Sequence, residues 1–186
     1  PAHASLEAQG RPRAMVVASP FDEVCVLTQK ALHSEHCRIY TSSDLRGVEL
    51  SGAMVKTLSV AVGLADGVDY GAGAKGVIVT RGIAEASRLG AAIGAHPKTF
   101  WGLAGVGDLV SCAASENHPN YAAGLTLARG GAVSSRIIDE TRALLGLAES
   151  MNVELPLTAA VWALATGESG TKLAFDELMR REARSE

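Results

Sequence analysis

Two long helical stretches constrain the fold of this chain more than any other feature of its sequence. Apolar residues recur at helical spacing from about Val48 to Val68 and again from about Ala74 to Ile93, on more than one face of each stretch. A helix that is apolar on several faces is buried by other helices, and small residues such as Gly63 let those neighbours approach closely. The sequence therefore predicts a bundle of helices with these two at its centre.

Shorter helical patterns follow in the second half of the chain and complete the expected bundle. They cover His118–Arg129, Ser134–Met151, Leu157–Thr166 and Thr171–Arg184. From residue 45 onward the pattern is helical almost throughout, which favours a mainly α-helical fold.

The first 44 residues show a different pattern. They contain a short helical patch, an apolar strand pattern, a longer helical pattern and a second strand pattern, at Ala4–Gln9, Met15–Ala18, Phe21–His33 and Cys37–Thr41. Strand, helix and strand in this order form the crossover unit of a parallel sheet. Because two strands do not make an independent sheet, we expect residues 1–44 to be the C-terminal edge of a larger α/β domain and the chain to be a fragment. Residues 45–186 are then a separate helical domain.

Composition and charge exclude several classes of partner. The chain has 186 residues and a net charge of −3 without a broad basic region, so no nucleic-acid partner is expected. Cys25, Cys37 and Cys112 show no metal-ligand spacing, and an odd number of cysteines suits a reducing cytosol better than disulfides. The apolar runs are interrupted by glycine or charge before they could span a bilayer. We therefore expect a soluble cytoplasmic protein without a metal or a membrane partner.

A glycine-rich turn at Gly102–Leu109 delivers one carboxylate, Asp108, to the start of an apolar run. Glycine lets the backbone approach a ligand closely, so this acid is placed to meet hydroxyl groups or an ammonium group. The alternative is a helix connection in which Asp108 is an N-cap. Cys112 follows one helical turn later and is expected to face the same cavity, without a partner base that would make it a nucleophile.

The polar loop Ser115–Tyr121 follows and offers His118 and Asn120 as groups that could converge with Asp108 on a polyol. The alternative is a surface loop in which His118 begins a helix with Pro119 at its first position.

Charged residues within the long helices have two possible roles. Lys56 lies in an apolar stretch, where it could act as a general acid or base, or could extend its ammonium group to water. Lys75 and Arg81 are at helical spacing for ordinary ion pairs with Glu85. Gly71–Gly76 matches the dinucleotide fingerprint G-x-G-x-x-G, but no strand precedes it, so it is interpreted as a turn between helices.

Several motifs taken together carry a family resemblance. They are Pro1–Ala4, Gly47–Leu50, Gly63–Gly67, Ala74-Lys75, Thr80–Glu85, Thr99–Leu109 and Val153–Pro156. Over most of its length the chain resembles the C-terminal part of bacterial NAD(P)-dependent glycerol-3-phosphate dehydrogenases. The resemblance implies a mainly α fold, a 6-phosphogluconate-dehydrogenase-like C-terminal helical domain preceded by the last β-α-β piece of a Rossmann-type α/β domain.

The resemblance also implies an activity and a site. This family transfers a hydride between NAD or NADP and the pair dihydroxyacetone phosphate and sn-glycerol 3-phosphate, with a lysine handling the proton on the carbonyl oxygen. It further implies a homodimer that acts on a small-molecule substrate. Carried over residue by residue, it assigns Asp108, Asn120, His118 and Cys112 to substrate binding, Ala4, Ile137 and Asp139 to cofactor binding, and Lys56 to proton transfer as the nearest candidate.

The chain departs from the family pattern at the catalytic lysine. Val55 stands in the lysine's place, and Lys56 stands in the place of the neighbouring asparagine. One residue along a helix is a rotation of about 100°, so Lys56 projects toward a different face unless its long stem bends back.

The polar loop and the cofactor segment depart as well. Where the family has Ser-Arg-Asn, this chain has His118-Pro119-Asn120, and a proline cannot bind an anion through the forked contact of an arginine. Cys112 stands in the place of a threonine, and Ile137–Glu140 in the place of Val-Val-Glu-Gly.

Three hypotheses about function remain open from the sequence. The first is a glycerol-3-phosphate dehydrogenase for which glycerol 3-phosphate is a poor substrate, or in which other groups hold the phosphate. The second is a paralogue without dehydrogenase activity, kept as a binding or assembly subunit. The third is an enzyme that acts on another hydroxy acid or polyol.

Overall fold

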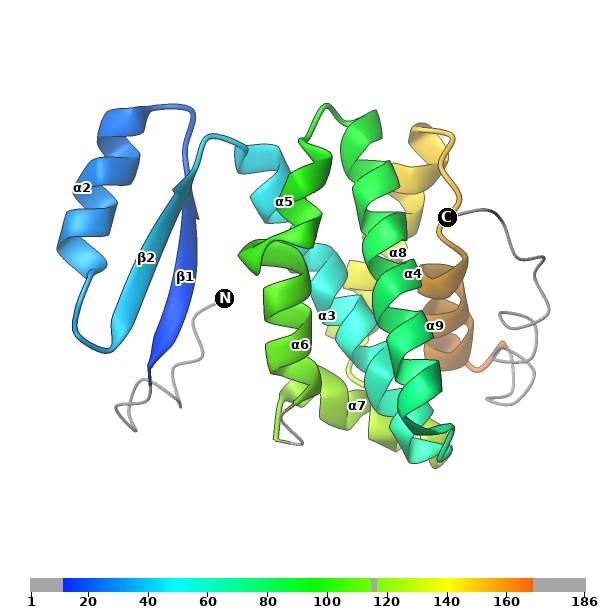
Figure 1. The fold of residues 1–186 in the computed structure, drawn as a ribbon. Helices are drawn as coiled ribbons and strands as arrows, with labels where there is room; N and C mark the ends of the chain where they lie inside the picture. Colours follow the sequence, from blue (N-terminus) through cyan, green and yellow to red (C-terminus); the bar gives the residue numbers. More distant parts are fainter. Residues whose placement is uncertain (1–11, 115–116, 169–186) are drawn as a thin grey trace.

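The structure is a computed structural model that describes residues 12–114 and 117–168. Its described part begins with two parallel strands, β1 (Arg13–Ala18) and β2 (Cys37–Ser42), joined by helix α2 (Asp22–Leu32). The predicted strand, helix and strand are therefore present, and Figure 1 shows this unit beside a bundle of helices. The helical patterns predicted at Ala4–Gln9 and Thr171–Arg184 lie outside the described residues.

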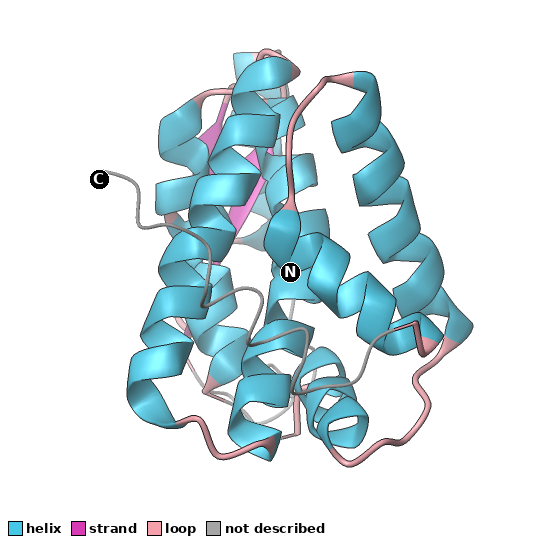
Figure 2. Ribbon diagram, turned by 90° about the vertical axis from the view of Figure 1, so that its right-hand side faces the viewer, coloured by secondary structure: helices cyan, strands magenta, loops and turns pink. Residues whose placement is uncertain are grey.

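Within the described residues, eight helical elements follow the second strand and form the bundle (Figure 2). They are α3 (Leu45–Gly67), α4 (Gly71–Ala92), α5 (Pro97–Trp101), the π-helical turn η1 (Leu103–Gly107), α6 (Asp108–Ala113), α7 (Pro119–Ala128), α8 (Ser135–Ser150) and α9 (Pro156–Thr166). The mainly helical fold with a β-α-β unit in front of it, as the sequence predicts, is confirmed.

Helix α3 is the central element of the bundle. From Leu50 to Ala65 most of its side chains are buried, and it packs against α4, α6, α7, α8 and α9 as well as β1. Asp44 caps its first turn by accepting a hydrogen bond from the backbone N–H of Gly47 at 3.0 Å. The same carboxylate accepts from the N–H of His96 and the hydroxyl of Thr99, so the cap also fixes the start of α5.

Helix α4 differs from the prediction because only one of its faces is buried. Ile78, Ile83 and Leu89 lie in the core, whereas Val77 on the opposite side is 41% exposed. The glycine-rich segment Gly71–Gly76 forms the first residues of α4 and is not a turn between helices. Gly71 takes a φ of +76° and begins the helix, and the turn comes earlier, where Asp69 has a φ of +58°.

By length and apolar composition, α3 could also cross a membrane, which corrects the expectation that every apolar run is interrupted too early. Glycine is neutral enough in hydropathy that Gly52 and Gly63 do not break the run. Most of the segment is buried inside the bundle, as in the core helix of a globular domain.

Candidate functional site

A cavity of about 220 Å³ lies between β1 and the helical bundle. Its walls come from the first residues of β1, from Val48 and Gly52 on α3, and from the turn that leads into α6, including Asp108. The cavity therefore lies where the β-α-β unit meets the helices, which is a common position for a ligand site in a two-part fold.

The turn that carries Asp108 depends on glycine for its shape. A Cβ atom on Gly105 would lie 1.9 Å from the carbonyl oxygen of Phe100, a buried residue, so a larger residue cannot take this place. The backbone N–H of Gly107 donates to the carbonyl of Gly102 at 3.1 Å and closes the π-helical turn. As a result Asp108 enters the first turn of α6 with a side chain that is only 7% exposed. The N-cap position belongs to Gly107, so the alternative of Asp108 as an N-cap is wrong.

Asp108, Cys112 and His118 lie close together. The thiol of Cys112 lies 3.9 Å from the Oδ1 atom of Asp108 and 3.4 Å from the Nε2 atom of His118. Burial raises the pKa of Cys112 to about 11, and the negative charge of Asp108 contributes to the increase. At neutral pH the thiol is therefore protonated, and it serves as a weak hydrogen-bonding group between an acid and an imidazole.

Asn120 lies one residue into α7, directly after Pro119, and is 6% exposed. The helix starts at Pro119, with His118 at the N-cap position, as one of the sequence interpretations proposes. The start of α7 therefore carries both candidate site residues of the loop, with His118 beside Cys112.

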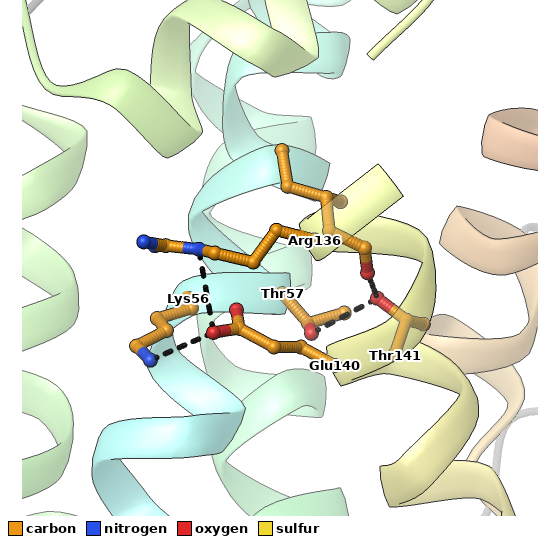
Figure 3. A network of polar contacts seen from close by, with 6 residues as sticks. Lys56, Thr57, Arg136, Glu140 and Thr141 are labelled. Carbon is orange, nitrogen blue, oxygen red and sulfur yellow. Dashed lines mark hydrogen bonds and ion pairs between the residues drawn. The ribbon is translucent and has the colours of Figure 1, made fainter. Parts of the chain in front are cut away.

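Lys56 lies apart from Asp108, and its side chain is directed toward α8. Its ammonium group forms an ion pair with Glu140 on α8, with Nζ 3.1 Å from Oε1, and Arg136 contacts the same oxygen at 3.5 Å (Figure 3). Lys56 is not among the residues that line the cavity, and Val55 beside it is buried at 2% exposed. The structure therefore does not bring the ammonium group of Lys56 together with Asp108, because that group is held against Glu140.

Two of the predicted cofactor-binding residues, Ile137 and Asp139, lie on α8, the helix that carries Glu140, and neither lines the cavity. Ile137 is buried, and its carbonyl accepts a hydrogen bond from the hydroxyl of Thr141 at 2.7 Å. Asp139 has a side chain that is 68% exposed and lies 4.0 Å from Arg142. Ala4 lies outside the described residues.

The expected ion pair of Lys75 or Arg81 with Glu85 is wrong. Lys75 instead pairs with Asp66 of α3 at 2.9 Å, and Asp66 also accepts a hydrogen bond from the hydroxyl of Tyr121. Because that hydroxyl comes from α7, one carboxylate joins α3, α4 and α7. These hydrogen bonds, together with the charge of Lys75, outweigh burial and lower the pKa of Asp66.

Glu85 has a structural role that the sequence did not reveal, since it was expected only as an ion-pair partner. It is 2% exposed, and it accepts hydrogen bonds from the backbone N–H groups of Leu157 and Thr158, at 2.7 and 3.3 Å, and from the hydroxyl of Thr158. A buried carboxylate of α4 thus satisfies the free N–H groups at the start of α9. The available signal was an acid placed among apolar residues of a helix, together with Pro156 at the start of another helix.

The architecture defines the class of protein: a helical domain joined to the parallel β-α-β unit from which dinucleotide-binding domains are built. Residues 44–176 match the sequence family described as the C-terminus of NAD-dependent glycerol-3-phosphate dehydrogenase. Since this match covers more than half of the chain, the chain belongs to that family.

Individual relatives agree with the family. The chain is 39% identical over 195 residues to glycerol-3-phosphate dehydrogenase (NAD(P)+) 1 of Salinibacter ruber, covering 100% of this chain and 57% of the relative. It is 41% identical over 184 residues to the enzyme of the same name from Streptomyces coelicolor, covering 94% and 55%. A crystal structure of glycerol-3-phosphate dehydrogenase from Coxiella burnetii superposes with a TM-score of 0.91 at 30% identity, covering 97% of this chain and 58% of that one. The chain thus spans a little more than half the length of the relatives that it matches.

Proposed function

We propose that this chain supplies the substrate-binding part of an oxidoreductase that transfers a hydride between NAD or NADP and the pair dihydroxyacetone phosphate and sn-glycerol 3-phosphate. In this proposal, residues 1–44 belong to the edge of the nucleotide-binding domain and residues 45–186 form the substrate-binding domain. The protein acts in the cytoplasm as a homodimer. Family membership supports the reaction, and the parallel β-α-β unit supports a dinucleotide cofactor.

The observation that carries the proposal is the position of Asp108. It is 7% exposed and lines the cavity at the junction of the two parts. A buried carboxylate is a strong acceptor for the hydroxyl groups of a three-carbon polyol, because such hydrogen bonds are charge-assisted. Asn120 is also buried and carries an amide that both donates and accepts, but it is not among the residues that line this cavity.

The bound cofactor would supply the hydride, and the residues of this chain would hold the substrate. Asp108 would accept a hydrogen bond from the carbon chain's hydroxyl groups, while the protonated thiol of Cys112 and the ring of His118 keep the position of that carboxylate fixed. Gly107 of the turn lines the cavity, and because it has no side chain a ligand can approach the backbone there.

A turnover assay of the full-length protein tests this function. Dihydroxyacetone phosphate and reduced NAD or NADP are supplied, and the loss of reduced-nicotinamide absorbance is followed. We expect turnover by the wild type and a loss of about 100-fold or more in kcat/KM for Asp108→Asn, since a charge-assisted contact becomes a neutral one.

A matched control is Asp22→Asn, which makes the same change on the exposed start of α2 and is expected to leave kcat/KM unchanged. Absence of turnover with either nicotinamide would instead favour a paralogue that binds without reacting. Turnover of another polyol or hydroxy acid alone would keep the reaction type and change the substrate.

A further inference from the structure

Lys56 lies on the row of α3 that faces the cavity, one turn beyond it. Val48 and Gly52 both line the cavity, and Lys56 is the next residue at the same spacing of four. Residues four apart on a helix have Cβ atoms about 5–6 Å from each other. The base of the Lys56 side chain is therefore next to the cavity wall, although its ammonium group lies against α8.

The space beside Gly52 is open in the direction that a lysine side chain takes. A Cβ atom built on Gly52 meets no heavy atom within 4 Å. Side chains on a helix tilt toward its N-terminus and cover the preceding turn. The stem of Lys56 can thus lie over Gly52, which brings its ammonium group to the cavity without moving the backbone.

The contact that holds Lys56 away from the cavity is weak and replaceable. The side chains of Lys56 and Glu140 are 44% and 31% exposed, and ion pairs at such positions are screened by water. Glu140 also contacts Arg136 at 3.5 Å, one turn earlier on the same helix, so it keeps a cationic partner when Lys56 leaves (Figure 3).

The residues that line the cavity do not carry enough positive charge to balance an anionic ligand. Among the described residues of its wall, Arg13 is the cationic residue and Asp108 the acidic one, so their charges cancel. A phosphate monoester carries about −1.5 to −2 charges at pH 7. At least one further cation is needed to offset this charge, and Lys56 is the neighbouring one on the same helix row.

We propose that Lys56 moves between two partners, Glu140 and an anionic group of the ligand in the cavity, so that Glu140 competes with the ligand for the ammonium group. Lys56 is then the residue that binds the phosphate, and Glu140 is a positioning residue that acts through it. The choice of a phosphate ester as ligand rests on the proposed function.

Equilibrium binding to the full-length protein tests the exchange. Inorganic phosphate and sn-glycerol 3-phosphate are titrated by calorimetry, with glycerol as the neutral comparison. Glu140→Gln removes the competing carboxylate and is expected to increase the affinity for both anions by about two- to fivefold, which is the effect of one exposed ion pair. Lys56→Gln is expected to weaken both by about tenfold or more, and Lys56→Arg to restore part of the loss. Glycerol is expected to respond to neither.

The double variant decides whether Glu140 acts through Lys56. When Lys56→Gln is present, Glu140→Gln is expected to have no further effect, because there is no ammonium group left to release. Glu149→Gln makes the same change near the exposed end of α8 and serves as the control. The proposal would be overturned if Glu140→Gln and Glu149→Gln bound the anions with equal affinity. It would also be overturned if Glu140→Gln still increased the anion affinity in the Lys56→Gln background, or if the wild type bound neither anion.

The turnover assay separates this proposal from the proposed function. If dihydroxyacetone phosphate is reduced but the variants bind anions alike, the exchange of Lys56 is wrong and the function stands. If the variants follow the expected pattern with inorganic phosphate but no turnover occurs, the anion site stands and the dehydrogenase function is wrong.

Discussion

The carbonyl oxygen of Tyr121 lies 2.1 Å from the point that a Cβ atom on Gly63 would occupy. The contact is reciprocal, because a Cβ atom on Gly124 would lie 2.1 Å from the carbonyl oxygen of Val60. Helices α3 and α7 thus meet backbone to backbone at two neighbouring glycines. Since His118 and Asn120 flank Pro119 at the start of α7, this crossing sets where the polar end of α7 lies relative to α3.

A methyl group at this crossing is expected to separate the two helices. Gly124→Ala should lower the free energy of unfolding by about 2–3 kcal/mol, because the atoms nearest the new methyl group are backbone atoms that cannot turn aside. Gly146→Ala is the matched control, since Gly146 lies in α8 with open space around it and alanine there should stabilise by about 0.5–1 kcal/mol. Urea unfolding of both variants measures the difference, and equal effects would contradict the close crossing.

Removing the carboxylate of Glu85 is expected to destabilise the junction of α4 and α9. In Glu85→Ala, the buried N–H groups of Leu157 and Thr158 lose their acceptor, and the side chain leaves a cavity. We expect a loss of about 2–4 kcal/mol in the free energy of unfolding. Glu149→Ala, at an exposed position of α8, should change it by less than about 0.5 kcal/mol.

The same residue gives a pH dependence with a defined sign. Burial raises the pKa of Glu85 above 4.5, despite the hydrogen bonds that favour its charged form. Between the ordinary pKa of the unfolded chain and the raised pKa of the folded protein, the folded protein binds more protons than the unfolded chain. This contribution to stability therefore grows as the pH falls and is lost as the pH rises through the raised pKa. Wild type should therefore gain stability relative to Glu85→Gln between pH 7 and pH 4.5, as measured by urea unfolding at several pH values. A difference that shrinks over this range would contradict it.

Asp44 is expected to show the opposite pH dependence. Burial raises its pKa, but the hydrogen bonds from Thr99, His96 and Gly47 outweigh burial and hold the pKa below 3.8. The unfolded chain then binds the proton more readily, so the contribution is present above pH 3.8 and is lost as the pH falls through the lowered value. Asp44→Ala should cost about 1–2 kcal/mol at pH 7, and the cost should decrease under strongly acidic conditions. Thermal unfolding of both proteins across this pH range measures it, with Asp22→Ala as the exposed control.

The charge of Asp108 is expected to control the ionisation of Cys112. Replacing it in Asp108→Asn removes a negative charge beside the thiol, so the pKa of Cys112 should fall below its value of about 11. The ultraviolet absorbance of the thiolate, followed against pH in a background with Cys25→Ala and Cys37→Ala, reports this value. Asp22→Asn should leave it unchanged, and an unchanged value in Asp108→Asn would mean that burial alone sets it.

Local signals were enough to predict the longer elements of the fold, whereas the short helices α5 and α6 and the turn η1 between them were not predicted. The spacing of apolar residues located α3 and the β-α-β unit, because these patterns depend on neighbours within one element. The predicted start of α3 at Val48 came three residues late, since its cap is made by Asp44, whose other partners, His96 and Thr99, lie far along the chain. The sequence predicted that α4 is buried on more than one face, because the spacing of apolar residues does not show which faces of a helix its neighbours will cover.

The candidate site was predictable only where one segment builds it. The glycine turn and the spacing of four place Asp108 beside Cys112, and both are read directly from the sequence. The partner of Lys56 was not predictable, because Glu140 is 84 residues away and reaches it only through the packing of α8 on α3. The role of Glu85 has the same origin, with its partners 72 and 73 residues away.

Different faces of helix α3 contact different neighbours, and this limits which substitutions the helix can tolerate. Ser51 binds the carbonyl of Ala104 behind the glycine turn, and Thr57 contacts Thr141 of α8, so successive turns of one helix are committed to different neighbours. A substitution that changes the packing on one face of α3 must also be accommodated by the contacts on its other faces. New substrate preferences should therefore be easier to select at the ends of α6 and α7 than anywhere along the central helix, which makes those ends the favourable targets for directed evolution.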